Sequence, residues 1–414
     1  MHRLVSVLGI VVFIGLAWLM SSHKRRFPWR VVVGGLALQF AFAAFILLTD
    51  AGKAVFRGVN KVFVGLLESV DVGAAFVFGE GFAEHFFAFR ILPTIIFFSA
   101  FMSIFYYYGI MQKVVGLLAI VMQKSLGTSG AETLSAAANI FVGQTEAPLV
   151  IRPYISSMTI SELNAVMIGG FATMAGGVLG GLSGMGFDAG HLLSASVISA
   201  PCALLLAKVM QPELDQPKTM GHVSLDIEDK SANVLEAIAN GTIGGLQLAL
   251  NVGAMLIVFL ALIAVINLVV GWVGAQFGYV DGVGDDVQYL WSLEAALGRL
   301  FAPLAWLIGI EWKDCARAGE LMGLKMATNE FVAYIRLASW GAEESVVEIS
   351  ARTRLIMTYA LCGFANFSSI GIQLGGIGGI APDRRGDLAR LGLRAMLGGT
   401  LAAFITASIA SLML

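Results

Sequence analysis

Long stretches without a charged residue recur along most of the chain. The hydrocarbon core of a bilayer is about 30 Å thick, so an apolar run of roughly 17 residues or more predicts a membrane-spanning helix. The chain has about eight such runs by this criterion, approximately at residues 4–20, 31–49, 91–112, 163–187, 189–207, 246–272, 355–372 and 395–414. The charge-free stretch 237–280 is too long for one helix, and we expect its ends to lie along the interface or in loops. This pattern predicts an all-α polytopic membrane protein.

Two further apolar segments, 127–151 and 317–340, are interrupted by glycine, proline and acidic residues. Neither is typical of one uninterrupted spanning helix. We interpret both as re-entrant helical hairpins that are buried in protein, because lipid cannot satisfy a broken backbone. Counting spans along the chain predicts that the first hairpin enters from the cytoplasm and the second from outside. Opposite entry is what an inverted repeat requires.

Other segments have the mixed composition of helices that lie along a membrane surface. Residues 51–68 combine a basic face with apolar side chains, and 111–124 and 290–310 are similar candidates. The polar stretch 211–232 is predicted to link the two repeat halves. The predicted organisation is 1–110 for the N-terminal helices and an interfacial helix, 111–210 for the first repeat half, 211–245 for the linker with an interfacial segment, 246–285 for the sixth span and 286–414 for the second repeat half.

The basic residues predict the orientation. Lys24, Arg25, Arg26 and Arg30 follow the first apolar run and place the first loop in the cytoplasm. We therefore expect the N-terminus outside and, after an even number of spans, the C-terminus outside as well. No small-residue cleavage site follows the first run, which predicts that it is retained as a helix.

The composition agrees with a membrane protein and excludes other classes. Hydrophobic residues make up 57% of the 414 residues and charged residues 13%, whereas soluble domains carry about 25% charged residues. The net charge of −2 excludes a nucleic-acid binder that works by neutralising phosphates. The three cysteines and five histidines have no spacing that indicates a disulfide framework or a zinc site.

Two acidic motifs carry the candidate chemistry, Gly143-Gln144-Thr145-Glu146-Ala147-Pro148 and Asn329-Glu330-Phe331-Val332-Ala333-Tyr334. Each carboxylate is the only charge in its apolar surroundings. A carboxylate at the centre of a spanning helix costs about 2.5–3.5 kcal/mol, so it usually faces a cavity and has a function.

Each acidic motif is followed by a second, matching motif: Gly170-Phe171-Ala172-Thr173 in the first half and Gly363-Phe364-Ala365-Asn366 in the second. A pair of motifs that occurs twice indicates a duplicated transporter core with one binding site between the halves.

The side chains of the two halves suit a polar solute. Gln144, Thr145 and Glu146 supply an amide, a hydroxyl and a carboxylate in succession, and a helix break at the hairpin tip would let them converge. Glu330 can accept two hydrogen bonds from a vicinal diol such as a ribose.

Asn366 and Ser369 add an amide and a hydroxyl on one helix face, three residues apart.

The polar residues of the two halves also have two simpler explanations than a solute site. Each carboxylate could pair with a basic residue such as Arg152 or Lys325. Thr173 or Asn366 could bridge packed helices instead of binding a solute.

With these motifs, the sequence resembles the concentrative nucleoside transporters, in their short prokaryotic form, over essentially its whole length. The resemblance is carried by residues 143–149, 251–256, 301–306, 319–334 and 363–371. It implies a homotrimer in the bacterial inner membrane that imports nucleosides with a coupling cation by an elevator-like movement. The mobile transport domain would contain both hairpins with the fourth, fifth, seventh and eighth spans, and 1–110 and 246–285 would be mainly scaffold.

The resemblance also implies roles for individual residues. The positions that match the nucleobase site of the family are Gln144, Thr145, Glu146, Val178 and Phe364. Those that match its ribose site are Glu330, Asn366 and Ser369. Those that match its sodium site, between the first hairpin tip and an unwound part of the fourth span, are Asn139, Val142, Thr173 and Met174.

We favour sodium as the coupling ion because Asn139 and Thr173, with backbone carbonyls, offer only oxygen ligands. Serine is common in the family where this chain has Thr173, which keeps the hydroxyl and adds a methyl group. Accumulating a solute 100-fold costs about 2.7 kcal/mol. One cation moving inward across about 100 mV supplies about 2.3 kcal/mol before its own gradient is added.

Three alternatives remain at this stage. A proton-coupled nucleoside symporter would use Glu146 or Glu330 as its titrating group. An intramembrane hydrolase would use the same two carboxylates as an acid–base pair, although no nucleophile or metal cluster is evident. A passive channel fits two closing hairpins less well than an occluding transporter.

Overall fold

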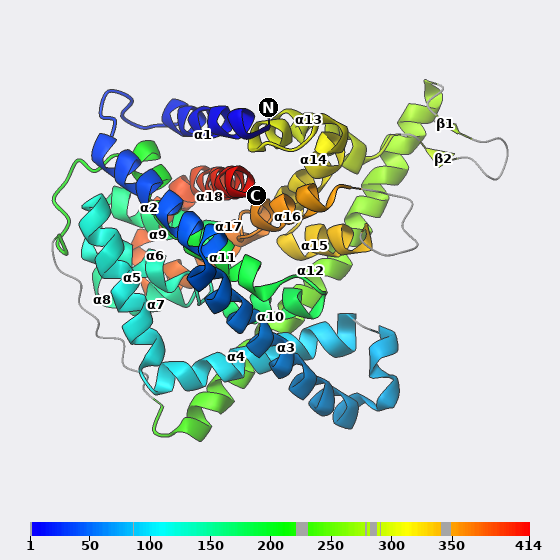
Figure 1. The fold of residues 1–414 in the computed structure, drawn as a ribbon, viewed down its shortest axis with the longest axis horizontal. Helices are drawn as coiled ribbons and strands as arrows, with labels where there is room; N and C mark the ends of the chain where they lie inside the picture. Colours follow the sequence, from blue (N-terminus) through cyan, green and yellow to red (C-terminus); the bar gives the residue numbers. More distant parts are fainter. Residues whose placement is uncertain are drawn as a thin grey trace.

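The computed structural model describes residues 2–85, 87–220, 231–277, 280–281, 288–289, 291–340 and 349–414. This part of the chain is almost entirely helical (Figure 1). The exception is a pair of two-residue strands, β1 (Val280–Asp281) and β2 (Gln288–Tyr289), which pair antiparallel. The all-α prediction is therefore confirmed. Residues 221–230 of the predicted linker lie outside the described residues.

The N-terminal part forms two apolar helices, a long amphipathic helix and a third apolar helix. Its elements are α1 (His2–Leu19), α2 (Trp29–Leu48), α3 (Asp50–Phe78), η1 (Glu80–His85), η2 (Phe87–Ile91), α4 (Leu92–Tyr107) and α5 (Ile110–Leu126). The interfacial helix predicted at 51–68 is longer, because α3 has 29 residues. The chain turns sharply between α2 and α3, where Gly52 packs so closely on the carbonyl of Phe45 that a side chain would collide with it.

The predicted span 91–112 is wrong at its end. Helix α4 ends at Tyr107, and Gly109, with φ +72°, turns the chain into the separate helix α5. A left-handed backbone favours glycine, which explains why the apolar run continues while the helix does not.

The first repeat half contains the first hairpin and two long apolar segments. Its helices are α6 (Gly130–Ala138), α7 (Ala147–Val150), α8 (Arg152–Ile155), α9 (Ile160–Ala172), α10 (Gly176–Gly184) and α11 (Ala189–Met210). Capping boxes start both α6, with Ser129 and Glu132, and α9, with Thr159 and Glu162. The two boxes are joined, because Ser129 Oγ donates to Glu162 Oε1 at 2.6 Å. The span predicted at 163–187 is therefore two helices with a break at 173–175.

Helix α12 (Val234–Gln276) contradicts one prediction. The stretch 237–280 was expected to be too long for one helix, yet α12 is continuous over 43 residues. Figure 1 shows it crossing much of the length of the molecule, behind α4 and up to the strand pair. The length argument failed because a helix that is strongly tilted, or that extends past the bilayer, has no upper limit of one bilayer thickness.

The second repeat half follows the same plan. Its elements are α13 (Leu293–Ile308), α14 (Trp312–Ala327), α15 (Glu330–Ser339), α16 (Ala351–Ala360), α17 (Phe367–Ile380), η4 (Pro382–Arg384) and α18 (Arg385–Met413). The second hairpin breaks at Thr328 and Asn329. The span predicted at 355–372 is wrong as a single helix, because the chain is not helical between Leu361 and Asn366. Both halves thus have a hairpin followed by a broken helix.

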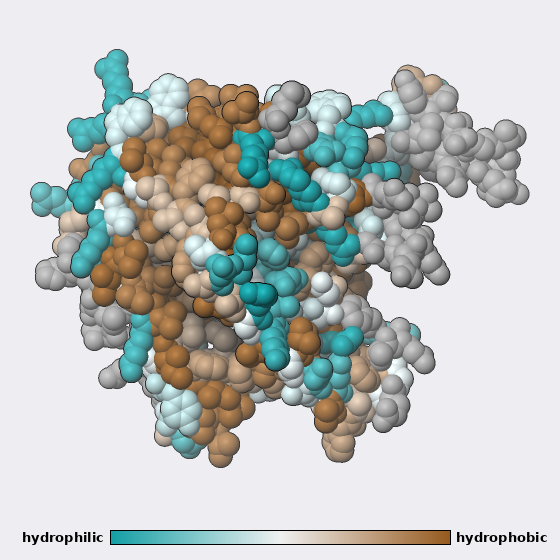
Figure 2. Space-filling view, in the orientation of Figure 1, coloured by the Kyte–Doolittle hydropathy of each residue, from teal (hydrophilic) through white to brown (hydrophobic). Residues whose placement is uncertain are grey.

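The apolar surface is extensive (Figure 2), and the core lies around α9, α11 and α18. Within the described residues, six helical segments are long and apolar enough to cross a membrane, and the bent pair α13–α14 would make seven. Of the predicted spans outside these six, 4–20 corresponds to a shorter apolar helix, and 355–372 overlaps the shorter apolar helix Phe367–Ile380 only at its end. In the apolar segment of α11, 89% of the residues are buried, whereas in that of α12 only 12% are. Helix α12 therefore exposes an apolar surface along most of its length.

Candidate functional site

The tips of both hairpins and the breaks in both broken helices meet at one cavity of about 470 Å³. All of the predicted substrate-binding residues line it: Gln144, Thr145, Glu146, Val178, Glu330, Phe364, Asn366 and Ser369. A larger groove of about 700 Å³ lies elsewhere and, apart from His85, is lined by apolar side chains and Gly253. The smaller cavity is therefore the one that can orient a polar solute.

The first hairpin tip is a tight turn that follows α6. The backbone N–H groups of Glu146 and Ala147 both donate to the Gly143 carbonyl, at 3.1 and 3.0 Å. The Glu146 carboxylate packs against Gly143, so a larger residue there would displace this side chain. Pro148 lies in the first turn of α7, where a missing N–H costs nothing. Glu146 is exposed, and the cavity therefore reaches the molecular surface beside this carboxylate.

The side chain of Gln144 connects the hairpin tip to α17. Its Nε2 donates to Ser369 Oγ at 3.2 Å, and its Oε1 accepts from Gln373 Nε2 at 3.0 Å. Gln373 also donates to the Met167 carbonyl of α9 at 3.1 Å and is fully buried. Sequence reasoning missed Gln373. Its signal is an amide one helical turn after Ser369 in an otherwise apolar helix.

The second half presents two asparagine-capped helix N-termini to the cavity. Asn329 Oδ1 accepts from the Val332 N–H at 3.0 Å and starts α15, whose first residue is Glu330. Asn366 Oδ1 accepts from the Ser369 N–H at 2.9 Å and starts α17. Asn366 Nδ2 also donates to Glu330 Oε2 at 3.1 Å. Asn366 therefore fixes a helix start and a carboxylate at once.

The ion-pair alternative for the two carboxylates is not supported. Within the described part of the chain, no Lys or Arg lies within 4 Å of the carboxylate of Glu146 or Glu330. Arg152 is exposed, and the ammonium of Lys325 donates to backbone carbonyls instead. Both carboxylates are thus available to a ligand.

Helix α12 contributes a polar pair that sequence reasoning did not place in the site. Gln247 and Asn251 line the cavity, and Gln247 Nε2 donates to Asn251 Oδ1 at 3.0 Å. Two amides four residues apart lie on one helix face, which was the available signal. The cavity therefore lies between α12 on one side and the hairpin tips on the other.

The predicted sodium ligands lie beside the same hairpin tip. Asn139 ends α6 and is 1% exposed, and its Oδ1 has no hydrogen-bond partner among the described residues. Thr173 ends α9, where its hydroxyl donates to the Gly169 carbonyl at 2.9 Å. Gly169 packs on Asn139, since a Cβ there would lie 3.4 Å from Asn139 Nδ2. The end of α6 and the end of α9 are therefore adjacent.

Met174 and Val142 lie at the same junction. The Met174 N–H donates to Ser196 Oγ at 3.3 Å, and the Gly176 N–H donates to the Phe141 carbonyl at 2.9 Å. An unpaired amide oxygen, a hydroxyl and the carbonyls of a helix break are the oxygen ligands that a hard cation prefers. In the described part of the chain, no group of three His, Cys, Asp or Glu residues could hold a metal ion. The junction thus fits sodium by the chemistry of its donors.

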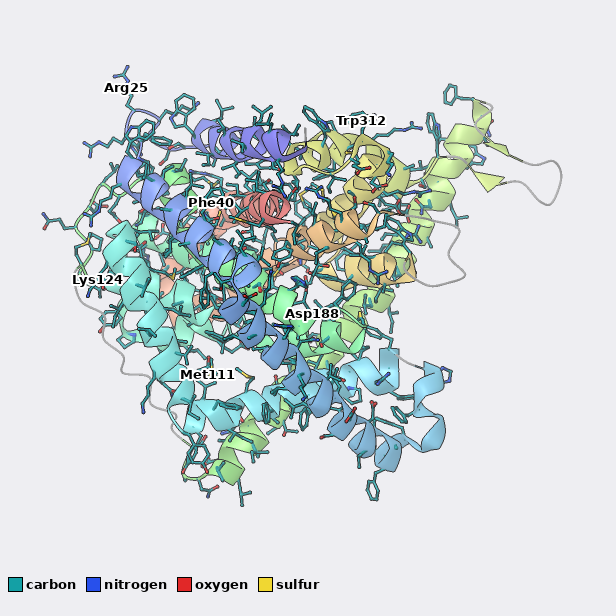
Figure 3. The ribbon with its side chains drawn as sticks, in the orientation of Figure 1. Arg25, Phe40, Met111, Lys124, Asp188 and Trp312 are labelled. Carbon is teal, nitrogen blue, oxygen red and sulfur yellow. The ribbon has the colours of Figure 1, made fainter. Side chains whose placement is uncertain are left out.

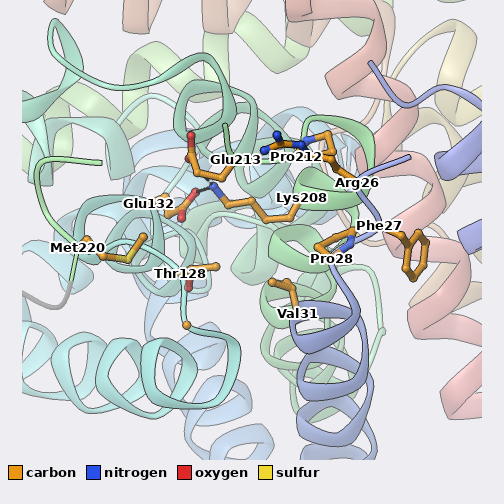
Figure 4. A pocket seen from close by; sticks show the side chains of 11 residues that line it. Arg26, Phe27, Pro28, Val31, Thr128, Glu132, Lys208, Pro212, Glu213 and Met220 are labelled. Atoms are coloured by element: carbon orange, nitrogen blue, oxygen red, sulfur yellow. Dashed lines mark hydrogen bonds and ion pairs between the residues drawn. The ribbon is translucent and has the colours of Figure 1, made fainter. Parts of the chain in front are cut away.

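A buried ion cluster supports the base of the first hairpin (Figure 4). Lys208 of α11 is 4% exposed, and its Nζ lies 2.7 Å from Glu132 Oε2 and 3.1 Å from Glu213 Oε2. The same ammonium donates to Ser161 Oγ at 2.9 Å. One cation therefore holds together the starts of α6 and α9, the end of α11 and the linker.

Comparison with known proteins gives a consistent picture. Residues 191–411 match a family model described as the C-terminus of Na⁺ dependent nucleoside transporters, residues 8–81 match the N-terminal model, and residues 88–186 match one described as nucleoside recognition. The chain is 48% identical over 419 residues to an uncharacterized transporter of Haemophilus influenzae, covering 100% of this chain and 98% of that one.

The chain is also similar to mammalian sequences and to solved structures. The chain is 43% identical over 423 residues to sodium/nucleoside cotransporter 1 of Sus scrofa and spans 64% of its length. Its fold matches CNTnw in an inward-facing substrate-bound state with a TM-score of 0.92 and 42% identity, over 100% of this chain and 98% of that one. A CNTnw variant in an outward-facing state matches with a TM-score of 0.91, at the same identity and coverage.

Proposed function

We propose that this chain, which belongs to the sodium-dependent nucleoside transporter family, imports nucleosides by symport with sodium. Sodium is the coupling ion of that family, whose members are cotransporters and not enzymes. The observation that carries the proposal is the single cavity at which both hairpin tips and both helix breaks meet. A site built equally from two repeat halves can be closed from either side of the membrane.

Within this cavity we assign the nucleobase to the first hairpin and the ribose to the second half. Gln144, Thr145 and Glu146 would bind the polar edge of the base, with Val178 and Phe364 as apolar walls. Glu330, Asn366 and Ser369 would bind the ribose hydroxyls. The carboxylate of Glu330, oriented by Asn366, suits two neighbouring hydroxyl donors.

The coupling ion would bind at Asn139, Val142, Thr173 and Met174. Asn139 and Gln144 lie on the same short segment between α6 and α7, so an ion that holds the first would restrict the second. Sodium would then favour the hairpin conformation that binds nucleoside, which is the differential affinity that coupling requires.

The movement would be of the elevator type, in a homotrimer. The hairpins with α9, α10, α11, α16, α17 and α18 would form the transport domain, corresponding to 111–210 and 286–414. Residues 1–110 and 246–285 would form most of the scaffold. The position of the cavity between α12 and the hairpin tips supports this division, and the exposed apolar surface of α12 offers a contact area for lipid or other subunits.

The orientation in a bacterial inner membrane follows from the basic residues. Arg25 and Lys124 are both exposed and lie at the same edge of the molecule (Figure 3). A cytoplasmic position for this edge places both termini outside.

The test is uptake of radiolabelled uridine into proteoliposomes that contain the purified protein. An inward sodium gradient is compared with potassium, each with and without a pH gradient. We expect accumulation above equilibrium only with sodium. Accumulation driven by the pH gradient alone would contradict sodium coupling and favour the proton-coupled alternative, and chemical change of the recovered uridine would favour the hydrolase.

A further inference from the structure

The ammonium of Lys325 is buried at the second helix break. Lys325 lies in the last turn of α14 and is 3% exposed. Its Nζ donates to the carbonyls of Ala360 at 3.3 Å and Cys362 at 3.1 Å. Among the described residues, no carboxylate lies within 4 Å of this nitrogen. The charge is therefore compensated by backbone carbonyls and not by an ion pair.

These carbonyls belong to the end of a helix. Helix α16 ends at Ala360, and the chain does not become helical again until Phe367. The last carbonyls of a helix have no intrahelical partner and carry the negative end of its dipole. The ammonium thus lies where the C-terminal ends of α14 and α16 meet.

In the first repeat half two helix C-terminal ends also meet, but no lysine side chain is described between them. There the C-terminal ends of α6 and α9 meet, at Asn139 and Thr173. Instead of a buried ammonium, this junction has acceptors that lack a donor. Asn139 Oδ1 and Ser135 Oγ are both buried without a hydrogen-bond partner in the part of the chain that the structure describes.

The junction of α14 with α16 lies directly against the junction of α6 with α9. Gly363, in the second break, has φ +102° and packs against the end of α9, so that a Cβ there would lie 2.7 Å from the Phe171 carbonyl oxygen and 2.8 Å from the Ala172 carbonyl carbon. The two breaks are therefore in direct backbone contact. Phe364 and Asn366 of the substrate cavity lie on the same short segment as Gly363.

We infer that Lys325 is a built-in cation of the second repeat half, the counterpart of the sodium ion that we propose for the first. The inference rests on the proposed sodium site. Lys325 permanently holds the second break, and with it Phe364 and Asn366, in the form that binds nucleoside. Only the first break then depends on an ion from solution. Lys325 is a positioning residue, because it contacts the backbone and not the cavity.

The experiment measures equilibrium binding of uridine to the purified full-length protein as a function of sodium concentration. Lys325→Met removes the charge and keeps most of the volume. Lys325→Asn also removes the charge, but leaves room for a cation and supplies an amide oxygen as Asn139 does. Lys313→Met, on the exposed side of α14, is the matched control.

We expect Lys325→Met to lower uridine affinity about tenfold or more at saturating sodium, while Lys313→Met binds as the wild type does. In Lys325→Asn we expect high sodium to restore uridine affinity, with a steeper sodium dependence than the wild type because a second ion replaces the ammonium. A purely structural role would lower stability without changing this slope.

Wild-type uridine affinity and sodium slope in Lys325→Met would overturn the inference, and so would a wild-type slope in Lys325→Asn. If Lys325→Met fails to fold, as judged by size-exclusion chromatography, the slopes of Lys325→Asn and Lys325→Arg decide. We expect the arginine, which keeps the charge, to retain the wild-type slope. Absence of sodium-dependent uridine binding in the wild type would instead contradict the proposed function itself.

Discussion

At the scale of single residues, the binding cavity is organised by amide side chains. Gln144, Asn366 and Gln373 each make two or more hydrogen bonds, which together join the first hairpin tip to α9, α15 and α17. Such side chains have fixed orientations, so they can present a donor or an acceptor to a ligand without first losing rotamer freedom. The carboxylate of Glu330 is oriented in the same way, by Asn366.

Glu330→Gln tests the assignment of the ribose. The amide keeps the shape of the side chain but loses the charge and one acceptor, and hydrogen bonds to charged groups contribute about 1.5–3 kcal/mol. We expect uridine affinity to fall about tenfold or more, since about 1.4 kcal/mol corresponds to tenfold. Binding of 2′,3′-dideoxyuridine, which lacks both hydroxyls, should hardly change. An equal loss for both ligands would contradict the assignment.

Gln373→Leu tests whether Gln373 holds Gln144 in the orientation that binds the nucleobase. The leucine cannot donate to Gln144 or to the Met167 carbonyl, and a net hydrogen bond contributes about 0.5–1.5 kcal/mol. We expect uridine affinity to fall by about 3- to 10-fold, as measured by isothermal titration calorimetry. The control is Gln216→Leu, on the exposed linker. Unchanged affinity in Gln373→Leu would show that Gln144 is held in some other way.

At the scale of elements, the first hairpin depends on its base. Both α6 and α9 start with capping boxes, and Lys208 pairs with Glu132 of the first box. Breaking a buried ion pair by removing one partner leaves an uncompensated charge, which costs more than the pair itself contributes.

Lys208→Met should therefore destabilise the protein by about 3–5 kcal/mol, seen as a large drop in the midpoint of thermal unfolding. Lys313→Met, whose lysine is exposed and paired with the exposed Glu311, should shift the midpoint little. A small shift for Lys208→Met would mean that the cluster does not stabilise the folded hairpin.

The sequence predicted the type of nearly every element but not where helices break. Apolar runs locate helices well, but the eight-span pattern alone does not show the interruptions at 173–175 and 361–366, because most of their residues are apolar or small. The family resemblance implied an unwound part in the fourth span but none between 361 and 366. The cost of an open backbone there is met by partners far away in sequence, such as Lys325 and Ser196. No local pattern records them.

The sequence brought forward side chains that the fold gathers in one place, since all of the positions predicted to bind substrate line one cavity. The motifs lie at hairpin tips and helix breaks, where polar residues stand out against apolar surroundings. Gln247, Asn251 and Gln373 were missed because a packing role for an amide within a largely apolar helix is equally compatible with the sequence.

At the scale of the whole molecule, the two halves share a plan but differ in how the break is held. Among the described residues, the junction of α6 with α9 has buried oxygen atoms without a hydrogen-bond partner, whereas the junction of α14 with α16 has an ammonium. A symmetrical fold can thus respond to an ion at only one of its two junctions. Sodium-coupled import requires that each ligand raises the affinity for the other. By linkage, this coupling free energy is the same for sodium and for nucleoside.

The most direct measurement is the dissociation constant of uridine, with sodium and with potassium, for the wild type and Asn139→Ala. We predict that sodium tightens wild-type binding by about 5- to 150-fold and that Asn139→Ala binds uridine weakly and equally in both salts. The control is Asn164→Ala on α9, which removes another buried amide whose oxygen has no hydrogen-bond partner in the described part of the chain, and which should keep the sodium effect. Full sodium dependence in Asn139→Ala would contradict the account, because the ion would then act elsewhere than at the first hairpin tip.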